Sequence, residues 1–205
     1  MNDPRSAGSR RVAWYLVGLL ISQLGLAHVL SAAEIVVYGF EDGTEGWVIP
    51  DWAKSQSDYV VSELGVSSER AEEGHQSLLL QTAFPGQRWT GAYVECEVEV
   101  TDWTPFSRLA MSIALPSEAP KGLSARIILT VGDQWQWTEM NHAVPLVPGT
   151  WTTVSAKLTP GSFDWKFFPN EMFRKDVRKL GVRIESDKQP VYLGSVFLDN
   201  VRLAE

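Results

Sequence analysis

The segment VGDQWQWTEM, residues 131–140, places three side chains that could contact a ligand at alternate positions. In a β-strand, Trp135, Trp137 and Glu139 would point to the same side, because successive strand side chains alternate between the two faces. The two indole rings would lie about 7 Å apart, twice the rise per residue, and would form a stacking surface for a flat molecule. The same alternation also fits an inward-facing stripe of the core, so both interpretations stay open.

Polar side chains on neighbouring strands could complete such a ligand-binding face. Carboxylates accept hydrogen bonds, guanidinium groups donate them in pairs, and a tyrosine can do both. The residues of these types on the outward side of predicted strands are Tyr93, Glu95, Arg126, Arg183 and Glu185. With Trp135, Trp137 and Glu139 they make up the predicted ligand-binding set.

Period-two alternation of apolar and polar residues is the main structural signal after residue 33. In YVECEVEV, Val94 and Cys96 fall on one side and the glutamates on the other, and RLAMSIAL and ARIILTV alternate in the same way. Further strands are predicted in EIVVYGF, YVVSEL, SLLLQTA, TWTTVSAKL, LGVRIES and SVFLDNVRL, between turns rich in Gly, Pro, Asp and Ser. Many short strands in one domain predict an all-β, antiparallel sandwich or barrel.

One passage has helical spacing. In NEMFRKDVRKL, Phe173, Val177 and Leu180 recur at helical intervals, and Asn170 can cap the start. The sequence therefore predicts a single short helix that crosses one end of the sandwich.

The first 33 residues have the pattern of a secretory signal peptide. Arginines precede an apolar run from Val12 to Leu30, and the small residues of LSAAE follow, so cleavage is expected after Ala33. The alternative is an uncleaved membrane anchor, since the run is nearly long enough to span a bilayer. SRRVAW also resembles a twin-arginine signal, so either export route is open. Export predicts a periplasmic, cell-surface or extracellular location.

Residues 34–205 then form one domain with a substantial core. The formal net charge of −7 becomes −9 after cleavage, because residues 1–33 carry three arginines and one aspartate. Such an acidic chain is a poor match for nucleic acid or anionic lipid. The single cysteine, Cys96, can form no internal disulfide and is expected to be a small buried apolar residue.

Five motifs occur in an order that resembles a known group of proteins. They are YGFEDGTEGW, EGHQSLLL, TDWTPFSRLAMSIALP, GTWTTVSAKLTP and LGVRIESDKQPVYLGSVFLDNVRL, and the resemblance that they carry extends over nearly all of residues 34–205. This series resembles the jelly-roll, galactose-binding-like carbohydrate-binding modules of secreted polysaccharide-degrading systems, especially those that bind β-mannans and β-glucans. The resemblance implies a jelly-roll sandwich that binds a β-linked glycan without catalysis.

The resemblance also implies a structural calcium ion between the first and last strands. The matching positions are Glu41 in GFEDG and Asp199 in FLDNV. Calcium takes six to eight oxygen ligands, so backbone carbonyls would have to complete the shell. The alternative is that Asp42 and Gly43 make a turn and that Asp199 accepts a hydrogen bond from a backbone amide.

Trp14 belongs to the predicted signal peptide, and the other eight tryptophans divide into two groups. The resemblance implies that Trp47, Trp103 and Trp151 pack against the sandwich. Five others lie in or beside loops, where function concentrates, and are Trp52, Trp89, Trp135, Trp137 and Trp165. A sugar ring presents apolar C–H faces with hydroxyls at its rim, so indole rings next to Arg and Glu side chains suit it.

Two other functions remain as alternatives. Glu95, Glu97 and Glu99 share one strand face, and an inverting glycosidase needs carboxyl groups roughly 6.5 to 9.5 Å apart. A row of like charges is also common on edge strands, and His75 and His142 lack a nucleophile or metal cluster at a recognisable spacing. A hydrolase or lyase is therefore the weaker alternative, and a cell-surface assembly domain of the same fold is another.

Overall fold

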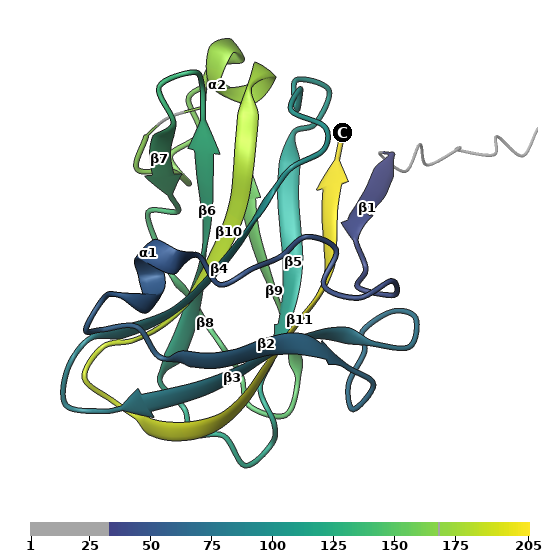
Figure 1. The fold of residues 1–205 in the computed structure, drawn as a ribbon. Helices are drawn as coiled ribbons and strands as arrows, with labels where there is room; N and C mark the ends of the chain where they lie inside the picture. The colour runs from purple at the N-terminus through teal and green to yellow at the C-terminus, as the bar shows by residue number, and fades with distance from the viewer. Residues whose placement is uncertain (1–32, 168) are drawn as a thin grey trace, which may run out of the picture. The chain divides into compact units, whose positions relative to one another are not determined.

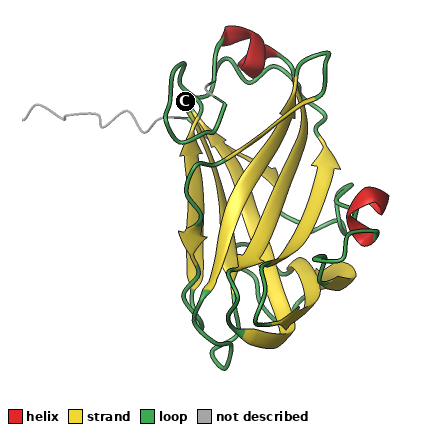
Figure 2. Ribbon diagram, turned by 90° about the vertical axis from the view of Figure 1, so that its left-hand side faces the viewer, coloured by secondary structure: helices red, strands yellow, loops and turns green. Residues whose placement is uncertain are grey.

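Two antiparallel sheets form the framework of the domain (Figures 1 and 2). The structure is a computed structural model that describes residues 33–167 and 169–205. The predicted signal peptide, residues 1–33, lies outside the described residues except for Ala33. The strand arrangement confirms the predicted all-β, two-sheet jelly-roll sandwich.

The larger sheet has six strands. Its main path runs β2 (Val61–Ser67), β3 (Ser77–Pro85), β11 (Val191–Ala204), β5 (Arg108–Ala114) and β9 (Trp151–Lys157). The first strand, β1 (Glu34–Tyr38), pairs with the end of β11, where Glu34 lies opposite Ala204. An ion pair of 2.5 Å between Arg202 and Glu34 also joins these two strands. The two ends of the domain are therefore held together by strand pairing.

The smaller sheet has five strands and carries the candidate site. Its path runs β4 (Thr90–Glu97), β10 (Val177–Ser186), β6 (Leu123–Val131) and β7 (Gln136–Glu139), and β8 (Val144–Pro145) pairs with β6. Figure 1 shows β10 between β4 and β6. Strands distant in the sequence are thus neighbours on one face.

The core lies between the sheets and contains the predicted apolar sides of the strands. Leu109 and Met111 of β5 face it from the larger sheet, and Ile127 and Val94 from the smaller one. Cys96 is buried and free, and burial raises the pKa of its thiol to about 12. These positions confirm the alternation predicted for β4, β5 and β6.

The predicted helix is shorter in the structure. Helix α2 contains only Glu171–Lys175, and Asn170 caps it by accepting a hydrogen bond of 2.8 Å from the Phe173 amide. The prediction that Val177 and Leu180 belong to this helix was wrong. Both residues lie in β10, where Val177 pairs with Val131 and Leu180 with Cys96 and Leu129. Pairing with two neighbouring strands overrides the local helical spacing.

Helix α1 (Asp51–Lys54) was not predicted. It lies in the connection between β1 and β2, beside the smaller sheet in Figure 1. Its Ala53 is buried in a small apolar cluster with Tyr93 and Ile128, which face away from the main core. This contact fixes the connection on the outer face of the sheet.

Within residues 33–167 and 169–205, no helix has the length and apolar character needed to cross a membrane.

Candidate functional site

The outer face of the smaller sheet brings distant residues together in rows. The strand register places Tyr93 of β4 opposite Arg183 of β10, which lies opposite Arg126 of β6. In the next row, Gly181 of β10 lies between Glu95 of β4 and Ile128 of β6. Ile128 in turn lies opposite Glu139 of β7. Because strand side chains alternate between faces, all these residues share the surface that the core does not use.

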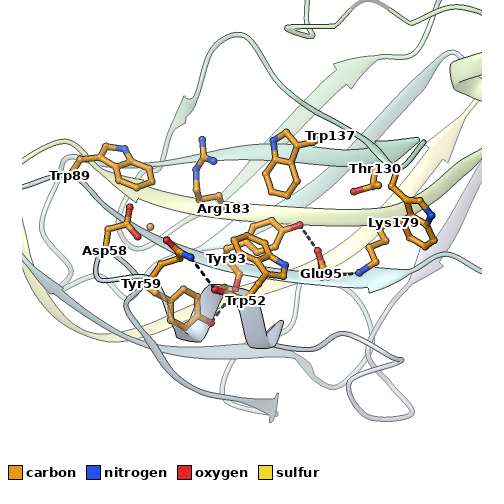
Figure 3. Close-up of a pocket in the computed structure, with 14 residues that line it drawn as sticks. Trp52, Asp58, Tyr59, Trp89, Tyr93, Glu95, Thr130, Trp137, Lys179 and Arg183 are labelled. Atoms are coloured by element: carbon orange, nitrogen blue, oxygen red, sulfur yellow. Dashed lines mark hydrogen bonds and ion pairs between the residues drawn. The ribbon is translucent and has the colours of Figure 1, made fainter. Parts of the chain in front are cut away.

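A groove of about 580 Å³ runs across this face and is bordered by the α1 segment. Figure 3 shows Trp89 at one end, Lys179 at the other, and Trp52, Tyr93 and Trp137 between them. The groove is lined by Trp52, Ala53, Gln56, Asp58, Tyr59, Trp89, Gly91, Tyr93, Glu95, Thr130, Trp135, Trp137, Lys179 and Arg183. Six of these fourteen residues are Trp or Tyr, so aromatic rings form a large part of the groove surface.

Three aromatic rings form the centre of the groove. The ring centroids of Trp52 and Tyr93 lie 5.1 Å apart, those of Tyr93 and Trp137 5.3 Å, and those of Trp52 and Trp137 5.9 Å. Trp52 is 49% exposed and Trp137 is 41% exposed. The rings support one another at distances typical of favourable aromatic pairs. Tyr93 is only 4% exposed, so the surface left open to a ligand belongs to the two indole rings.

A tryptophan beside a cationic side chain occupies each end. The guanidinium carbon of Arg183 lies 5.4 Å from the Trp89 ring centroid. At the other end, Arg178 lies 5.0 Å and the Lys179 ammonium 5.9 Å from the Trp135 ring centroid. Such cation–π contacts hold an exposed ring in place. Trp89 is 40% exposed and Trp135 is 52% exposed, so both rings still offer surface to solvent.

Gly181 is needed to hold Tyr93 in the floor of the groove. A Cβ atom at Gly181 would lie 2.6 Å from the Tyr93 hydroxyl oxygen and 2.8 Å from a ring carbon. We expect Gly181→Ala to push this ring aside and to destabilise the domain by about 1 to 3 kcal/mol, the usual cost of overpacking. Thermal unfolding measures the change. Gly65→Ala is the matched control, since Gly65 also lies in a strand but has no atom within 4 Å of its added Cβ; equal losses in both variants would contradict the clash.

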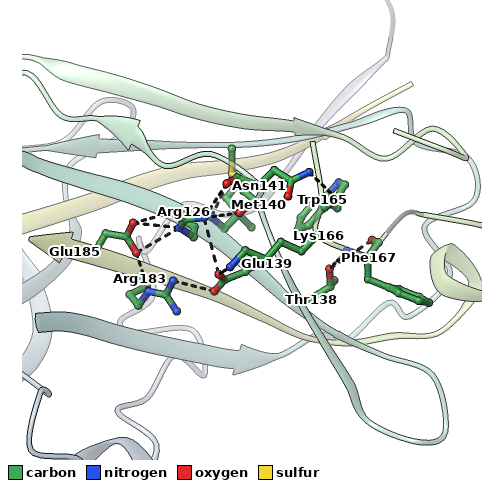
Figure 4. Close-up of polar contacts among 11 residues, drawn as sticks. Arg126, Thr138, Glu139, Met140, Asn141, Trp165, Lys166, Phe167, Arg183 and Glu185 are labelled. Atoms are coloured by element: carbon green, nitrogen blue, oxygen red, sulfur yellow. Dashed lines mark hydrogen bonds and ion pairs between the residues drawn. The ribbon is translucent and has the colours of Figure 1, made fainter. Parts of the chain in front are cut away.

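A network of ion pairs lies next to the groove on the same face (Figure 4). The Glu139 carboxylate contacts Arg183 at 2.8 Å and Arg126 at 3.9 Å, and Lys166 also donates a hydrogen bond to it. Glu185 completes the network through Arg126 at 2.9 Å and Arg183 at 3.0 Å. Burial alone would raise the pKa of Glu139, but the Lys166 hydrogen bond and the charges of Arg183, Lys166 and Arg126 lower it. Glu139 is therefore an ionised group that holds cations in fixed positions.

The structure brings five of the eight predicted ligand residues into the groove. These are Tyr93, Glu95, Trp135, Trp137 and Arg183. The exposure of Trp135 and Trp137 excludes the alternative of a core stripe. The other three predicted residues, Arg126, Glu139 and Glu185, do not line the groove. Glu139 is only 7% exposed, because the cations around it cover its carboxylate.

The expected strand geometry of Trp135 and Trp137 was wrong in one respect. Strand β7 begins at Gln136, and Trp135 lies in the preceding turn with a positive φ of 53°. Its amide donates a hydrogen bond of 3.1 Å to the Gly132 carbonyl. Gly132 and Trp135 thus close a tight turn, and the ring reaches the groove from the turn rather than from a regular strand.

Some groove residues were not predicted from the sequence, and Trp165, which was named with the loop tryptophans, lies in the core. Trp52 and Trp89 were named only as loop tryptophans. Lys179 was not placed on the ligand-binding face, because residues 170–180 were predicted to be helical. Extending the alternation of β10 back from Arg183 through Gly181 would have placed Lys179 on the groove face. Trp165 is fully buried, and its indole N–H donates a hydrogen bond of 2.7 Å to the Lys157 carbonyl.

The predicted packing tryptophans behave mainly as expected. Trp47 and Trp103 are buried, whereas Trp151, at the start of the edge strand β9, is half-buried. In the glutamate row, Glu97 is exposed and Glu99 lies beyond the end of β4. Glu95 and Glu99 therefore do not lie on one continuous strand.

The predicted calcium residues, Glu41 and Asp199, both hold the turn before β3. Glu41 Oε1 accepts hydrogen bonds from the amides of His75 at 2.8 Å and Gln76 at 3.1 Å. Asp199 Oδ2 accepts hydrogen bonds from the amides of Glu72 and Glu73. The turn after β1, which carries Glu41, and strand β11, which carries Asp199, are thereby both joined to the turn before β3. For Asp199 this is what the backbone-amide alternative expects.

A hard cation beside Asp199 would need more oxygen ligands than the carboxylates of the described residues supply. Burial raises the pKa of the Asp199 carboxyl, although the backbone amides oppose this effect. Among residues 33–167 and 169–205, no lysine or arginine forms an ion pair with Asp199, and the Asn200 Oδ1 atom is buried without a hydrogen-bond partner. No three His, Cys, Asp or Glu side chains of the described residues gather closely enough to hold a metal. Asn200 and backbone carbonyls would therefore have to supply ligands.

The fold and the site together define a class of protein: a β-sandwich with an aromatic groove across one of its sheets. A family model described as mannanase, galactose-binding domain-like matches residues 38–200, and the chain belongs to this family. A search of curated proteins gave no match.

Several solved structures have the same fold. CBM27-1 of Caldicellulosiruptor saccharolyticus, solved in complex with mannohexaose, is 18% identical with a TM-score of 0.59 and covers 85% of this chain and 98% of its own. A carbohydrate-binding module specific for non-crystalline cellulose, CBM28, is 18% identical with a TM-score of 0.61 and covers 83% and 94%. The family 11 module of Clostridium thermocellum, solved with a β-1,3-1,4-mixed-linked tetrasaccharide, is 12% identical with a TM-score of 0.52 and covers 85% and 96%.

Proposed function

We propose that this domain binds a β-linked polysaccharide of the mannan or glucan type and performs no catalysis on it. The observation that carries the proposal is the groove with four partly exposed tryptophans: Trp52, Trp89, Trp135 and Trp137. Monomeric proteins rarely leave so much aromatic surface exposed in one place unless it contacts a ligand.

The chemistry of the groove matches the two surfaces of a sugar chain. Indole rings can stack on the apolar C–H faces, while Arg183, Lys179 and Glu95 can hydrogen-bond with hydroxyls at the edge. The groove also runs along β4 from Trp89 to Glu95, a span of about 20 Å at the usual rise per residue. This length suits several sugar rings in line, as in a polysaccharide. The sugar complexes of the structural neighbours support the same assignment.

Affinity electrophoresis tests this proposal. The domain should be retarded in gels that contain soluble β-mannan or β-glucan, and an α-glucan gel of the same viscosity serves as the control. Equal mobility in every gel would contradict the proposal. Incubation with the glycans and an assay for new reducing ends tests the non-catalytic role, because steady release of sugar would place the protein among the hydrolases.

We further propose that Glu41 and Asp199 help to hold a structural calcium ion. A bound ion stabilises the folded state by about 2.7 kcal/mol when its concentration is a hundred times its dissociation constant. Chelator should therefore lower the melting temperature of the native protein and leave a variant with Glu41→Ala and Asp199→Ala unaffected. If native protein and double variant respond equally to chelator, the two carboxylates hold only the turn.

We also propose that the protein is exported and that residues 1–33 are removed. The proposal rests on the arginines, the apolar run and the small residues before Glu34. The intact mass of the protein recovered from the cell envelope or medium checks it, because a chain that begins at Glu34 is expected. Recovery of the full-length chain in the membrane fraction would favour the anchor instead.

A further inference from the structure

The end of the groove beyond the central rings has its own set of polar groups. Lys179 Nζ donates a hydrogen bond of 2.7 Å to Glu95 Oε1, and the Tyr93 hydroxyl donates one of 2.7 Å to Glu95 Oε2. Trp135 lies beside Lys179, and Thr130 also lines this end. Figure 3 shows Lys179, Glu95 and Thr130 together, with Trp89 at the opposite end.

The contacts within this set leave hydrogen-bonding capacity unused. An ionised carboxylate can accept about four hydrogen bonds, and an ammonium group can donate three. Glu95 accepts two from its side-chain partners, and Lys179 donates one to Glu95. Glu95 is only 4% exposed, but unlike the equally buried Glu139 it lines the groove together with Lys179. A buried acceptor and a partly exposed donor therefore lie side by side, 2.7 Å apart, in the groove wall.

Two adjacent groups of this kind match two adjacent hydroxyls of a sugar ring. One hydroxyl can donate to Glu95 while its neighbour accepts from Lys179, and the ring face can rest on Trp135. The charges of Lys179 and Glu95 cancel, which suits a neutral sugar. The other ion pairs of this face differ, because Glu139 and Glu185 do not line the groove and serve to hold Arg183.

We propose that Trp135, Lys179 and Glu95 form a separate subsite, which binds a vicinal diol of a sugar unit beyond the units on the central rings. The inference rests on the proposed function. It divides the groove into the central rings and this subsite. The subsite contributes only when the glycan is long enough to reach it. Tyr93 positions Glu95 through its hydroxyl and so connects the subsite to the central rings.

Ligands of graded length test the subsite. Binding of β-1,4-linked oligosaccharides from the trimer to the hexamer is measured by calorimetry for the wild type, Lys179→Met and Trp135→Ala. Both substitutions should lower the affinity for the hexamer about ten-fold and leave the trimer affinity unchanged. Lys157→Met is the matched control, since Lys157 is exposed on β9 of the other sheet, and it should change neither value.

A modified ligand tests recognition of the diol itself. Hexamers with methylated hydroxyls on either terminal unit are compared with the parent hexamer. In the wild type, one of the two methylated hexamers should bind about ten-fold more weakly than the unmodified hexamer. In Lys179→Met, the same methylated hexamer should bind as tightly as the unmodified one, because the variant has already lost the contact.

Three results bear against these proposals in different ways. A Lys179→Met variant that loses the same factor for trimer and hexamer, or that loses affinity for neither, would overturn the subsite. Equal effects of terminal methylation in wild type and variant would overturn recognition of the diol. If the wild type bound no oligosaccharide at all, the proposed function itself would fail.

Discussion

Replacing Trp137 by alanine should lower the affinity for a β-linked glycan about thirty-fold or more and leave the domain folded. A few aromatic anchors usually carry most of the energy of an interface, and loss of one costs about 2 kcal/mol or more, where 1.4 kcal/mol is ten-fold. Trp137 contacts both Trp52 and Tyr93, so its removal also opens the central cluster. Calorimetry gives the affinity and thermal unfolding the stability.

Two control variants separate binding from folding in this experiment. Trp47→Ala removes a fully buried ring and should cost about 3 to 5 kcal/mol of stability. Leu193→Ala removes an exposed apolar side chain of β11, on the other sheet, and should change neither quantity. If Trp137→Ala instead lost as much stability as Trp47→Ala, the ring would be a part of the core rather than of a binding surface.

The second large effect is expected at Glu139. Glu139→Ala leaves Arg126, Arg183 and Lys166 without their shared carboxylate. Glu185 still pairs with both arginines, so the expected loss is about 1 to 3 kcal/mol, the usual cost of leaving buried polar partners unsatisfied. Denaturant unfolding measures the loss. The matched control is Glu97→Ala, an exposed glutamate of β4, which should change stability by no more than about 0.5 kcal/mol. Similar values for both variants would contradict the role of the network.

The same group predicts how stability depends on pH. The pKa of Glu139 is lower in the folded protein than in the unfolded chain, where it is about 4.3. Its stabilising contribution is therefore complete above the unfolded value and is lost as the pH falls through the folded pKa. The difference in stability between wild type and Glu139→Gln should shrink over this acidic range. A difference that stays constant down to acidic pH would show that Glu139 titrates normally.

Strand alternation predicted much of the sheet and its two faces, because it depends only on local chain geometry. Val94 and Cys96 face the core and Tyr93 and Glu95 the groove, as their positions in YVECEVEV require. Local spacing failed for Val177, where the choice between helix and strand is made by pairing with β6. Such pairing joins residues far apart in the chain and leaves no local signal.

The site was harder to predict than the fold for a similar reason. Glu139 has the side-chain type and strand position of a ligand contact, but Lys166, from a distant loop, covers its carboxylate. Trp52 enters the groove on α1, and the contact that holds it there is made by Ala53 against Tyr93 and Ile128. Residue type predicts which chemistry a side chain can perform, while tertiary contacts decide whether it reaches the ligand.

The central claim is that a glycan binds in this groove, and an NMR titration of the indole N–H signals tests it most directly. On addition of β-1,4-mannohexaose, the signals of Trp52, Trp89, Trp135 and Trp137 should shift and saturate together, because these rings line the groove. The signals of the buried Trp47, Trp103 and Trp165 should stay in place. Unchanged signals from all four groove tryptophans, with this ligand and with a β-glucan hexamer, would contradict glycan binding at this site.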